Sequence, residues 1–231
     1  MTLVKKELLI YPQLRSPRSA AIAGILFSLL MMTSMILFHN ILTVTPANIS
    51  KDWLEASAKT ASQALGLIPF AGIAFLWFTG VIRDWFGERE DRFFSTVFLG
   101  SGILFVGMLF VWATAFGAII GAYTVAADRL VKNDIFVFGL AFMNEILGSY
   151  ILRMVGVYMV SIGTLWARTG VMPRWLIIIT YIVAVGLLSF AGTITETRFI
   201  FPGWVFLVSV YIFIYRRIQY QKSKDELSLV D

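Results

Sequence analysis

Six long apolar segments, separated by shorter polar ones, make up most of the chain. A helix needs about 20 apolar residues to cross a hydrocarbon core that is about 30 Å thick. The third and fourth segments are longer than one crossing requires, so these helices tilt or extend beyond the core. The pattern predicts an all-α, polytopic transmembrane helix bundle, organised as one domain over residues 1–231. The predicted spans are residues 20–44, 64–85, 94–123, 135–167, 175–191 and 200–215.

Lys and Arg residues are distributed unevenly between the two sides of these spans. Six spans place both termini on one side, and that side carries thirteen of the 19 Lys and Arg residues, against five on the other. Cytoplasmic segments of membrane proteins carry the excess of positive charge. We therefore predict that the tails, residues 1–19 and 216–231, are cytoplasmic. The five residues on the opposite side are Lys51, Lys59, Arg129, Lys132 and Arg198.

Composition supports the same class of protein. Of 231 residues, 58% are hydrophobic and 14% are charged, whereas soluble domains carry about 25% charged residues. This shortage of charge excludes an ordinary soluble enzyme, a nucleic-acid-binding domain and a disordered chain. The chain has no Cys and one His, which excludes disulfides, Fe–S clusters and thiolate zinc sites. We expect no metal site and no cofactor, a lipid bilayer as the main partner, and no nucleic acid.

Two features bear on the helix that precedes and forms the second span. Ser50 is placed to cap a short helix in which Lys51, Glu55 and Lys59 are spaced four residues apart. This helix either lies on the membrane surface or extends the second span. Pro69 near the start of the second span and Pro202 near the start of the sixth are expected in first helical turns, where Pro is tolerated.

One polar group of residues stands out inside the predicted fourth span. Glu145, Ser149 and Arg153 follow at four-residue spacing, with Asn144 beside them. Ionisable residues inside a span are costly and mark functional sites by default. We therefore expect this polar stripe to face the bundle interior or a water-filled cavity, as a transport or ligand site, or to form a purely structural polar network.

His39 is the candidate partner of this polar stripe. If the fourth helix is centred near residue 151, Glu145 lies about 9 Å from the midplane, and His39 in the first helix lies about 12 Å from it on the same side. A pair at matched depth could exchange a proton, because histidine changes charge near neutral pH. The alternative places His39 and Asn40 at the outer headgroups, hydrated and without a role.

Small residues recur at four-residue spacing in two predicted spans. Ala113, Gly117 and Gly121 do so in the third span, and residues 20, 24 and 28 do so in the first. Such residues let helix backbones approach closely in lipid. Packing inside the bundle is the favoured interpretation, because six helices offer many internal neighbours, and a homodimer face is the alternative.

The turn Arg168–Trp175 (RTGVMPRW) and the segment Gly87–Gly102 (GEREDRFFSTVFLGSG) resemble segments of uncharacterised bacterial multi-pass membrane proteins with about six helices. The resemblance implies a location in the bacterial inner membrane and no catalytic residues. In the turn itself, Gly170 is suited to a left-handed helix cap and Pro173 to the start of the next helix. Trp166 and Trp175 are expected at interfacial depth.

Three functions remain open from the sequence. The first is transport or sensing of a small molecule or ion through the polar stripe. The second is a structural or accessory membrane subunit, as a homo-oligomer or within a larger membrane complex. An intramembrane enzyme ranks last, because such enzymes need an acid–base pair, a metal or an activated nucleophile, and the spans hold one His and no Asp. We nominate no catalytic residues.

Overall fold

The computed structural model describes residues 17–42, 51–86, 92–130, 134–190 and 195–228, and these ranges contain helices and no strand. This confirms the all-α helical bundle. The helices are α2 (Pro17–Leu42), α3 (Lys51–Phe86), α4 (Arg92–Leu130), α5 (Asp134–Glu145), α6 (Leu152–Thr169), α7 (Arg174–Phe190) and α8 (Ile200–Ser228), with a π-helix η3 (Ile146–Ile151) and a 3-10 helix η4 (Thr195–Phe199).

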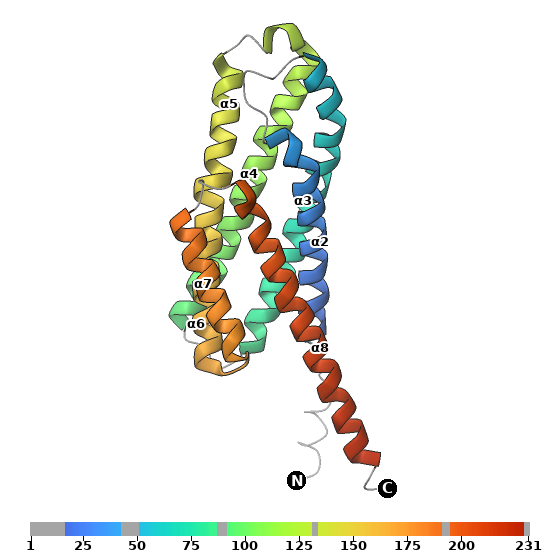
Figure 1. The fold of residues 1–231 in the computed structure, drawn as a ribbon, viewed down its shortest axis with the longest axis vertical. Coiled ribbons are helices and arrows are strands. Elements are labelled where there is room, and N and C mark those ends of the chain that lie inside the picture. The colour runs from blue at the N-terminus through green and yellow to red at the C-terminus, as the bar shows by residue number, and fades with distance from the viewer. Residues whose placement is uncertain (1–16, 43–50, 87–91, 131–133, 191–194, 229–231) are drawn as a thin grey trace, which may run out of the picture.

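The six predicted spans correspond to six helical rods, since α5, η3 and α6 form one continuous rod, which we call the α5–α6 rod. Five rods are long and apolar enough to cross a membrane. The exception is α7, which has 17 residues. Figure 1 shows that α7 covers only part of the length of the α5–α6 rod, and that α8 begins partway along the bundle.

The rods are arranged so that one end of the bundle is rich in arginine. The first helix begins there, α3 and α6 end there, and α7 begins there (Figure 1). Arg18, Arg83, Arg168 and Arg174 are exposed at this end, which we call the basic end. These four residues are among those predicted to be cytoplasmic. Because these arginines lie on different helices but at the same end, their position agrees with an even number of membrane crossings.

Neighbouring rods contact one another in the order α7, α6, α4, α3, α2, α8. The first and last members, α7 and α8, have few backbone contacts and are joined by side chains instead. Trp204 of α8 donates a hydrogen bond from Nε1 to Oγ1 of Thr180 in α7, at 2.9 Å, and its ring lies 5.8 Å from that of Trp166. The bundle is therefore an open ring of helices that aromatic side chains close near the basic end.

The core holds a cluster of five aromatic rings, one from each of α2, α3, α4, α6 and α8. Ring centroids lie 4.9 Å apart for Phe75 and Phe105, 5.0 Å for Phe27 and Phe75 and 5.9 Å for Tyr158 and Phe201. All five side chains are at most 2% exposed. Aromatic rings therefore fill the bundle where these five helices converge.

Some buried hydroxyl groups join neighbouring helices. Ser34 in α2 donates to the carbonyl oxygen of Ala64 in α3 at 3.0 Å, which ties the two helices together. The hydroxyls of Thr79 and Tyr158 lie 3.1 Å apart and join α3 to α6. Such interhelical bonds satisfy groups that water does not reach.

The small-residue spacing in α2 is used inside the bundle. A Cβ atom added at Gly24 would overlap Oγ of Ser209 in α8 and lie 2.8 Å from the Phe78 ring in α3. The predicted spacing in α4 is used in part, because a Cβ at Gly117 would lie 3.7 Å from Leu65 Cδ1 of α3. Of its other two members, Ala113 is half-buried and Gly121 is exposed.

The structure decides between the two interpretations of the segment before the second span. One helix, α3, runs without interruption from Lys51 to Phe86, so this segment extends the second span and forms no separate surface helix. As a result Pro69 lies in the middle of α3, and the expectation of a first-turn position was wrong. The third residue of α8 is Pro202, as expected for a first turn. Ser50 lies outside the described residues.

The turn between α6 and α7 forms as predicted. Gly170 has φ of 67° and its N–H donates to the carbonyl oxygen of Trp166 at 2.9 Å, which is a left-handed helix cap. Pro173 immediately precedes α7, and its carbonyl oxygen accepts a hydrogen bond from the N–H of Leu176 at 3.1 Å. Trp175 is exposed and Trp166 is fully buried. The interfacial depth of both stays a prediction.

Candidate functional site

The polar stripe does not face the bundle interior, so that expectation was wrong. Asn144, Glu145 and Arg153 are exposed and Ser149 is half-buried. The same rod carries an apolar row two residues out of step with the stripe, and this row is buried. In a helix, a shift of two residues turns a side chain to the opposite face. Burial of the apolar row therefore turns the stripe outward. The row consists of Met143, Leu147, Ile151 and Val155.

The π-helix η3 lies within this stripe and was not predicted. It follows Glu145 directly and includes Ser149. Arg153 donates from Nη1 to the carbonyl oxygen of Ser149 at 2.9 Å, so its side chain folds back along its own rod, away from the basic end. This is the direction in which helical side chains lean, toward the N-terminus.

Helix lengths place the stripe at the far edge of a hydrocarbon core. Ser149 lies about 20 residues from the basic end of its rod, or about 30 Å at 1.5 Å per residue. If the basic end marks one edge of a core about 30 Å thick, the Arg153 guanidinium reaches the other edge. Glu145, at about 36 Å, then lies among the headgroups. The depth inferred from sequence differs because it centred the fourth helix too far from the basic end.

His39 bonds to a residue other than Glu145. Its Nδ1 lies 3.0 Å from Nη2 of Arg198. A guanidinium can only donate hydrogen bonds, so Nδ1 is the acceptor and carries no proton in this bond. The Glu145 side chain has no hydrogen bond or ion pair with any residue in the described ranges, so the predicted proton-exchanging pair does not form. The side chain of Asn40 lies outside the described residues.

Arg198 is the residue that the sequence did not single out. It was assigned to the side opposite the basic end, as an outer-loop charge, but its side chain is 6% exposed. It belongs to η4, the short 3-10 helix that leads into α8, and its guanidinium lies 5.4 Å from the ring centroid of Phe199. No periodicity in residues 195–199 distinguishes a buried arginine from an exposed one at the start of a span.

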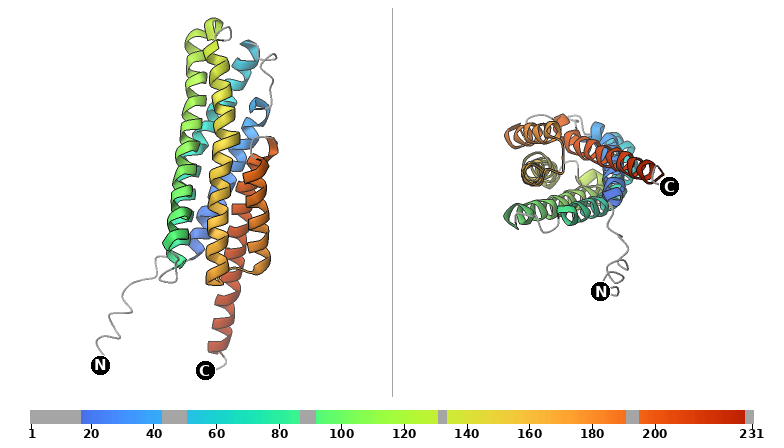
Figure 2. Two further views of the ribbon diagram at one scale, coloured as in Figure 1. Left: turned by 90° about the vertical axis from the view of Figure 1, so that its left-hand side faces the viewer. Right: turned by 90° about the horizontal axis from the view of Figure 1, so that it is seen from below.

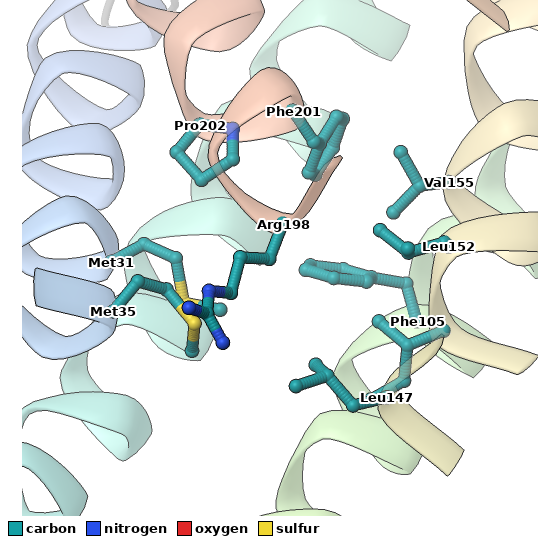
Figure 3. A pocket seen from close by; sticks show the side chains of 10 residues that line it. Met31, Met35, Phe105, Leu147, Leu152, Val155, Arg198, Phe201 and Pro202 are labelled. Carbon is teal, nitrogen blue, oxygen red and sulfur yellow. The ribbon is translucent and has the colours of Figure 1, made fainter. Parts of the chain in front are cut away.

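A small cavity lies beside Arg198, between the two halves of the open ring of helices (Figure 3). It has a volume of about 20 Å³, or about 290 Å³ of empty space when its open part is included. Arg198 is the one charged residue of its lining, and Figure 3 shows the guanidinium beside the thioethers of Met31 and Met35. The lining also includes Phe105, Leu147, Ile151, Leu152, Val155, Phe201 and Pro202.

The cavity is bordered by the π-helix η3 and by the aromatic cluster. The residues Leu147 and Ile151 come from the π-helix, and π-helices inside α-helices are frequent at functional sites. Phe201 belongs to the aromatic cluster, so that cluster borders the cavity. Arg198 shares the depth of His39, which lies about 21 residues or about 31 Å from Arg18. The cavity thus lies in the half of the span opposite the basic end.

The cavity presents one cationic side chain, Arg198, in an otherwise apolar lining. A buried guanidinium attracts an anionic group, with which it forms short and directional hydrogen bonds. In the described part of the chain no three His, Asp or Glu side chains gather as a metal site would require.

Comparison with known proteins finds no match. No protein-family model, curated protein or solved structure is similar to this chain. The function of the site therefore has to be inferred from its geometry and chemistry.

Proposed function

We propose that this chain is a multi-pass membrane protein that binds an anionic group at Arg198, and that it acts as a sensor or binding protein. The observation that carries this proposal is the Arg198 guanidinium, 6% exposed, beside a partly open cavity whose other lining residues are apolar. A guanidinium can donate hydrogen bonds in five directions and favours anionic acceptors over neutral ones. The cavity beside it therefore offers specificity for negative charge.

The packing of the bundle favours binding over passage through it. The polar stripe, which the sequence offered as a transport site, lies on the outside of the bundle. Next to the cavity, the rings of Phe105, Phe201 and Tyr158 are packed and buried. A solute that entered beside Arg198 would therefore have to displace this cluster to reach the basic end. Binding at one end of the span requires no such rearrangement.

Thermal unfolding of the purified protein in mild detergent tests this proposal. A panel of soluble and amphiphilic anions is added to the wild type and to the Arg198→Gln variant. A ligand at one hundred times its dissociation constant adds about 2.7 kcal/mol, which raises Tm by about 5–10 °C in a chain of this size. We expect at least one anion to stabilise the wild type and not the variant. Equal responses of both proteins to the whole panel would refute the proposal.

We place this protein in the cell membrane, with both termini in the cytoplasm. Five helices of sufficient length and apolarity and four exposed arginines at one end of the bundle support this topology. The bacterial inner membrane stays a prediction that depends on the resemblance of the Arg168–Trp175 turn.

An accessory subunit is the second candidate function. It is favoured by the outward position of Asn144, Glu145 and Arg153, where a neighbouring membrane protein could contact them. Copurification of a partner from native membranes that is lost in a Glu145→Gln, Arg153→Gln double variant would support this candidate. A partner retained at wild-type level by the double variant would exclude this surface.

A further inference from the structure

We infer that Met31 and Met35 form a peroxide-reactive pair, in which hydrogen peroxide that enters the cavity beside Arg198 converts one of the two to methionine sulfoxide. This inference goes beyond the proposed function, because it does not depend on the binding of an anion. Three observations carry it: the position of both thioethers in the wall of the cavity, the size of the cavity, and the guanidinium beside both sulfurs.

The two thioethers lie together in one wall of the cavity. Met31 and Met35 are four residues apart in α2, so their side chains are neighbours on one face of this helix, and both line the cavity. The opposite wall comes from the α5–α6 rod, which lies across the bundle interior from α2 (Figure 2). Neither side chain is more than 4% exposed, so the partly open cavity gives a small molecule its access to their sulfurs.

The size and depth of the cavity favour a small, uncharged oxidant. Its volume of about 20 Å³ accommodates about one water molecule, and hydrogen peroxide adds only one oxygen atom to that size. Met35 lies 17 residues from Arg18, or about 26 Å at 1.5 Å per residue, which is just inside the far edge of a hydrocarbon core about 30 Å thick. An uncharged molecule reaches this depth without the cost of burying an ion.

The cavity offers hydrogen-bond partners to a peroxide molecule. A buried water-sized molecule is held where it has two to four polar partners. Figure 3 shows the Arg198 guanidinium beside the sulfurs of Met31 and Met35, and its bond to Nδ1 of His39 at 3.0 Å holds it there. A guanidinium donates hydrogen bonds and a thioether sulfur accepts them weakly. A peroxide molecule between these groups therefore has an oxygen directed at a sulfur.

The oxidation needs no reactant besides hydrogen peroxide. A sulfur lone pair attacks the nearer peroxide oxygen, so that an S–O bond forms and the O–O bond breaks. The sulfur is oxidised by two electrons, and the leaving hydroxide takes the proton of the transferred hydroxyl and departs as water. The product is methionine sulfoxide, which methionine sulfoxide reductases return to the thioether. Its oxygen is a polar group beside the Arg198 guanidinium, where the wall of the cavity was apolar.

The volume of the cavity limits the reaction to one methionine of the pair. One added oxygen occupies the space of about one water molecule. A second oxygen on the neighbouring side chain would overpack the same space, and overpacking is destabilising. We therefore expect the pair to take up one oxygen atom under mild treatment.

Tandem mass spectrometry after limited peroxide treatment of the purified protein in mild detergent tests the inference, because fragment ions separate Met31 and Met35 from Met32 between them. The matched controls are Met143 and Met159, which are 1% and 0% exposed and do not line the cavity. We expect the pair to be oxidised at least about ten-fold faster than either control. Equal rates at the pair and the controls, or two oxygens on most pairs, would overturn the inference.

A variant that fills the cavity tests the route of the oxidant. Leu147→Phe narrows the cavity from the wall opposite Met31 and Met35, so it should slow their oxidation about ten-fold and leave the two control methionines unchanged. Leu104→Phe makes the same change at an exposed position and should alter no rate. A misfolded Leu147→Phe would instead speed oxidation of the control methionines, and the wild-type comparison then decides. Unchanged oxidation of the pair in folded Leu147→Phe would refute the cavity as the route.

Discussion

Arg198 donates a hydrogen bond from Nη2 to Nδ1 of His39 at 3.0 Å, across 159 positions of the chain. This bond joins the far end of α2 to η4, just where α8 begins. It also orients the guanidinium beside the cavity, because one of its nitrogens is held by the first helix of the bundle. The only histidine of the chain is therefore a positioning residue for its only buried arginine among the described side chains.

Loss of the acceptor at residue 39 should destabilise the protein. In His39→Leu, a buried guanidinium nitrogen loses its bonding partner, which costs about 1–3 kcal/mol. His39→Gln keeps a side-chain oxygen as an acceptor and should lose less. Thermal unfolding in mild detergent measures both. If the Leu variant unfolds at the wild-type temperature, the bond contributes nothing to stability.

Neutralising the polar stripe should leave stability almost unchanged. Glu145 and Arg153 are exposed, so we expect Glu145→Gln and Arg153→Gln each to change the free energy of unfolding by less than about 0.5 kcal/mol. Chemical denaturation in detergent measures this change, and ion flux in liposomes containing each variant gives a second readout. Altered flux in either variant would restore the stripe as a transport site.

Enlarging Gly24 should destabilise the contact between three helices. A Cβ at this position meets Ser209 of α8 and the Phe78 ring of α3, so Gly24→Ala should cost about 1–3 kcal/mol through overpacking. The matched control is Gly100→Ala, where a Cβ would have nothing within 4 Å. That variant should be neutral or more stable, because Ala favours helix by up to about 1 kcal/mol over Gly. Comparable Tm values for the two variants would contradict this packing.

Cysteine labelling should show which end of the bundle is cytoplasmic. The chain has no Cys, so Lys59→Cys and Asp84→Cys each create one thiol, on exposed positions at opposite ends of α3. Loss of an Asp has little influence on orientation. In intact cells, a membrane-impermeant maleimide should label residue 59 and not residue 84, and permeabilisation should expose both. The reverse pattern would invert the proposed topology.

Local signals predicted the helices and the α6–α7 turn because these depend on neighbours in sequence. Apolar run length located the six rods, and Gly170 and Pro173 form their turn through bonds that reach only a few residues. Pro69 shows the limit of such signals. The helix α3 continues through the polar segment before the second span, so a proline expected near a helix end lies in the middle.

The orientation of the α5–α6 rod explains why the structure places the candidate site at Arg198 and not at the polar stripe. Two rows of residues lie on opposite faces of this rod, one polar with Glu145 and Arg153 and one apolar with Leu147 and Ile151. Spacing alone identifies both rows, but only the packed bundle determines which one is buried. The side chain of Arg153 can extend to the edge of the hydrocarbon core, which allows the polar row to face outward.

Class, helix count and charge asymmetry thus follow from composition and periodicity, since hydrophobic length and helix propensity act locally along the chain. The partner of His39, the burial of Arg198 and the cavity beside Arg198 required the tertiary structure. Each depends on which segments distant in sequence come together, and an arginine at the start of a span has the same local sequence pattern whether its side chain turns toward the bundle or toward water.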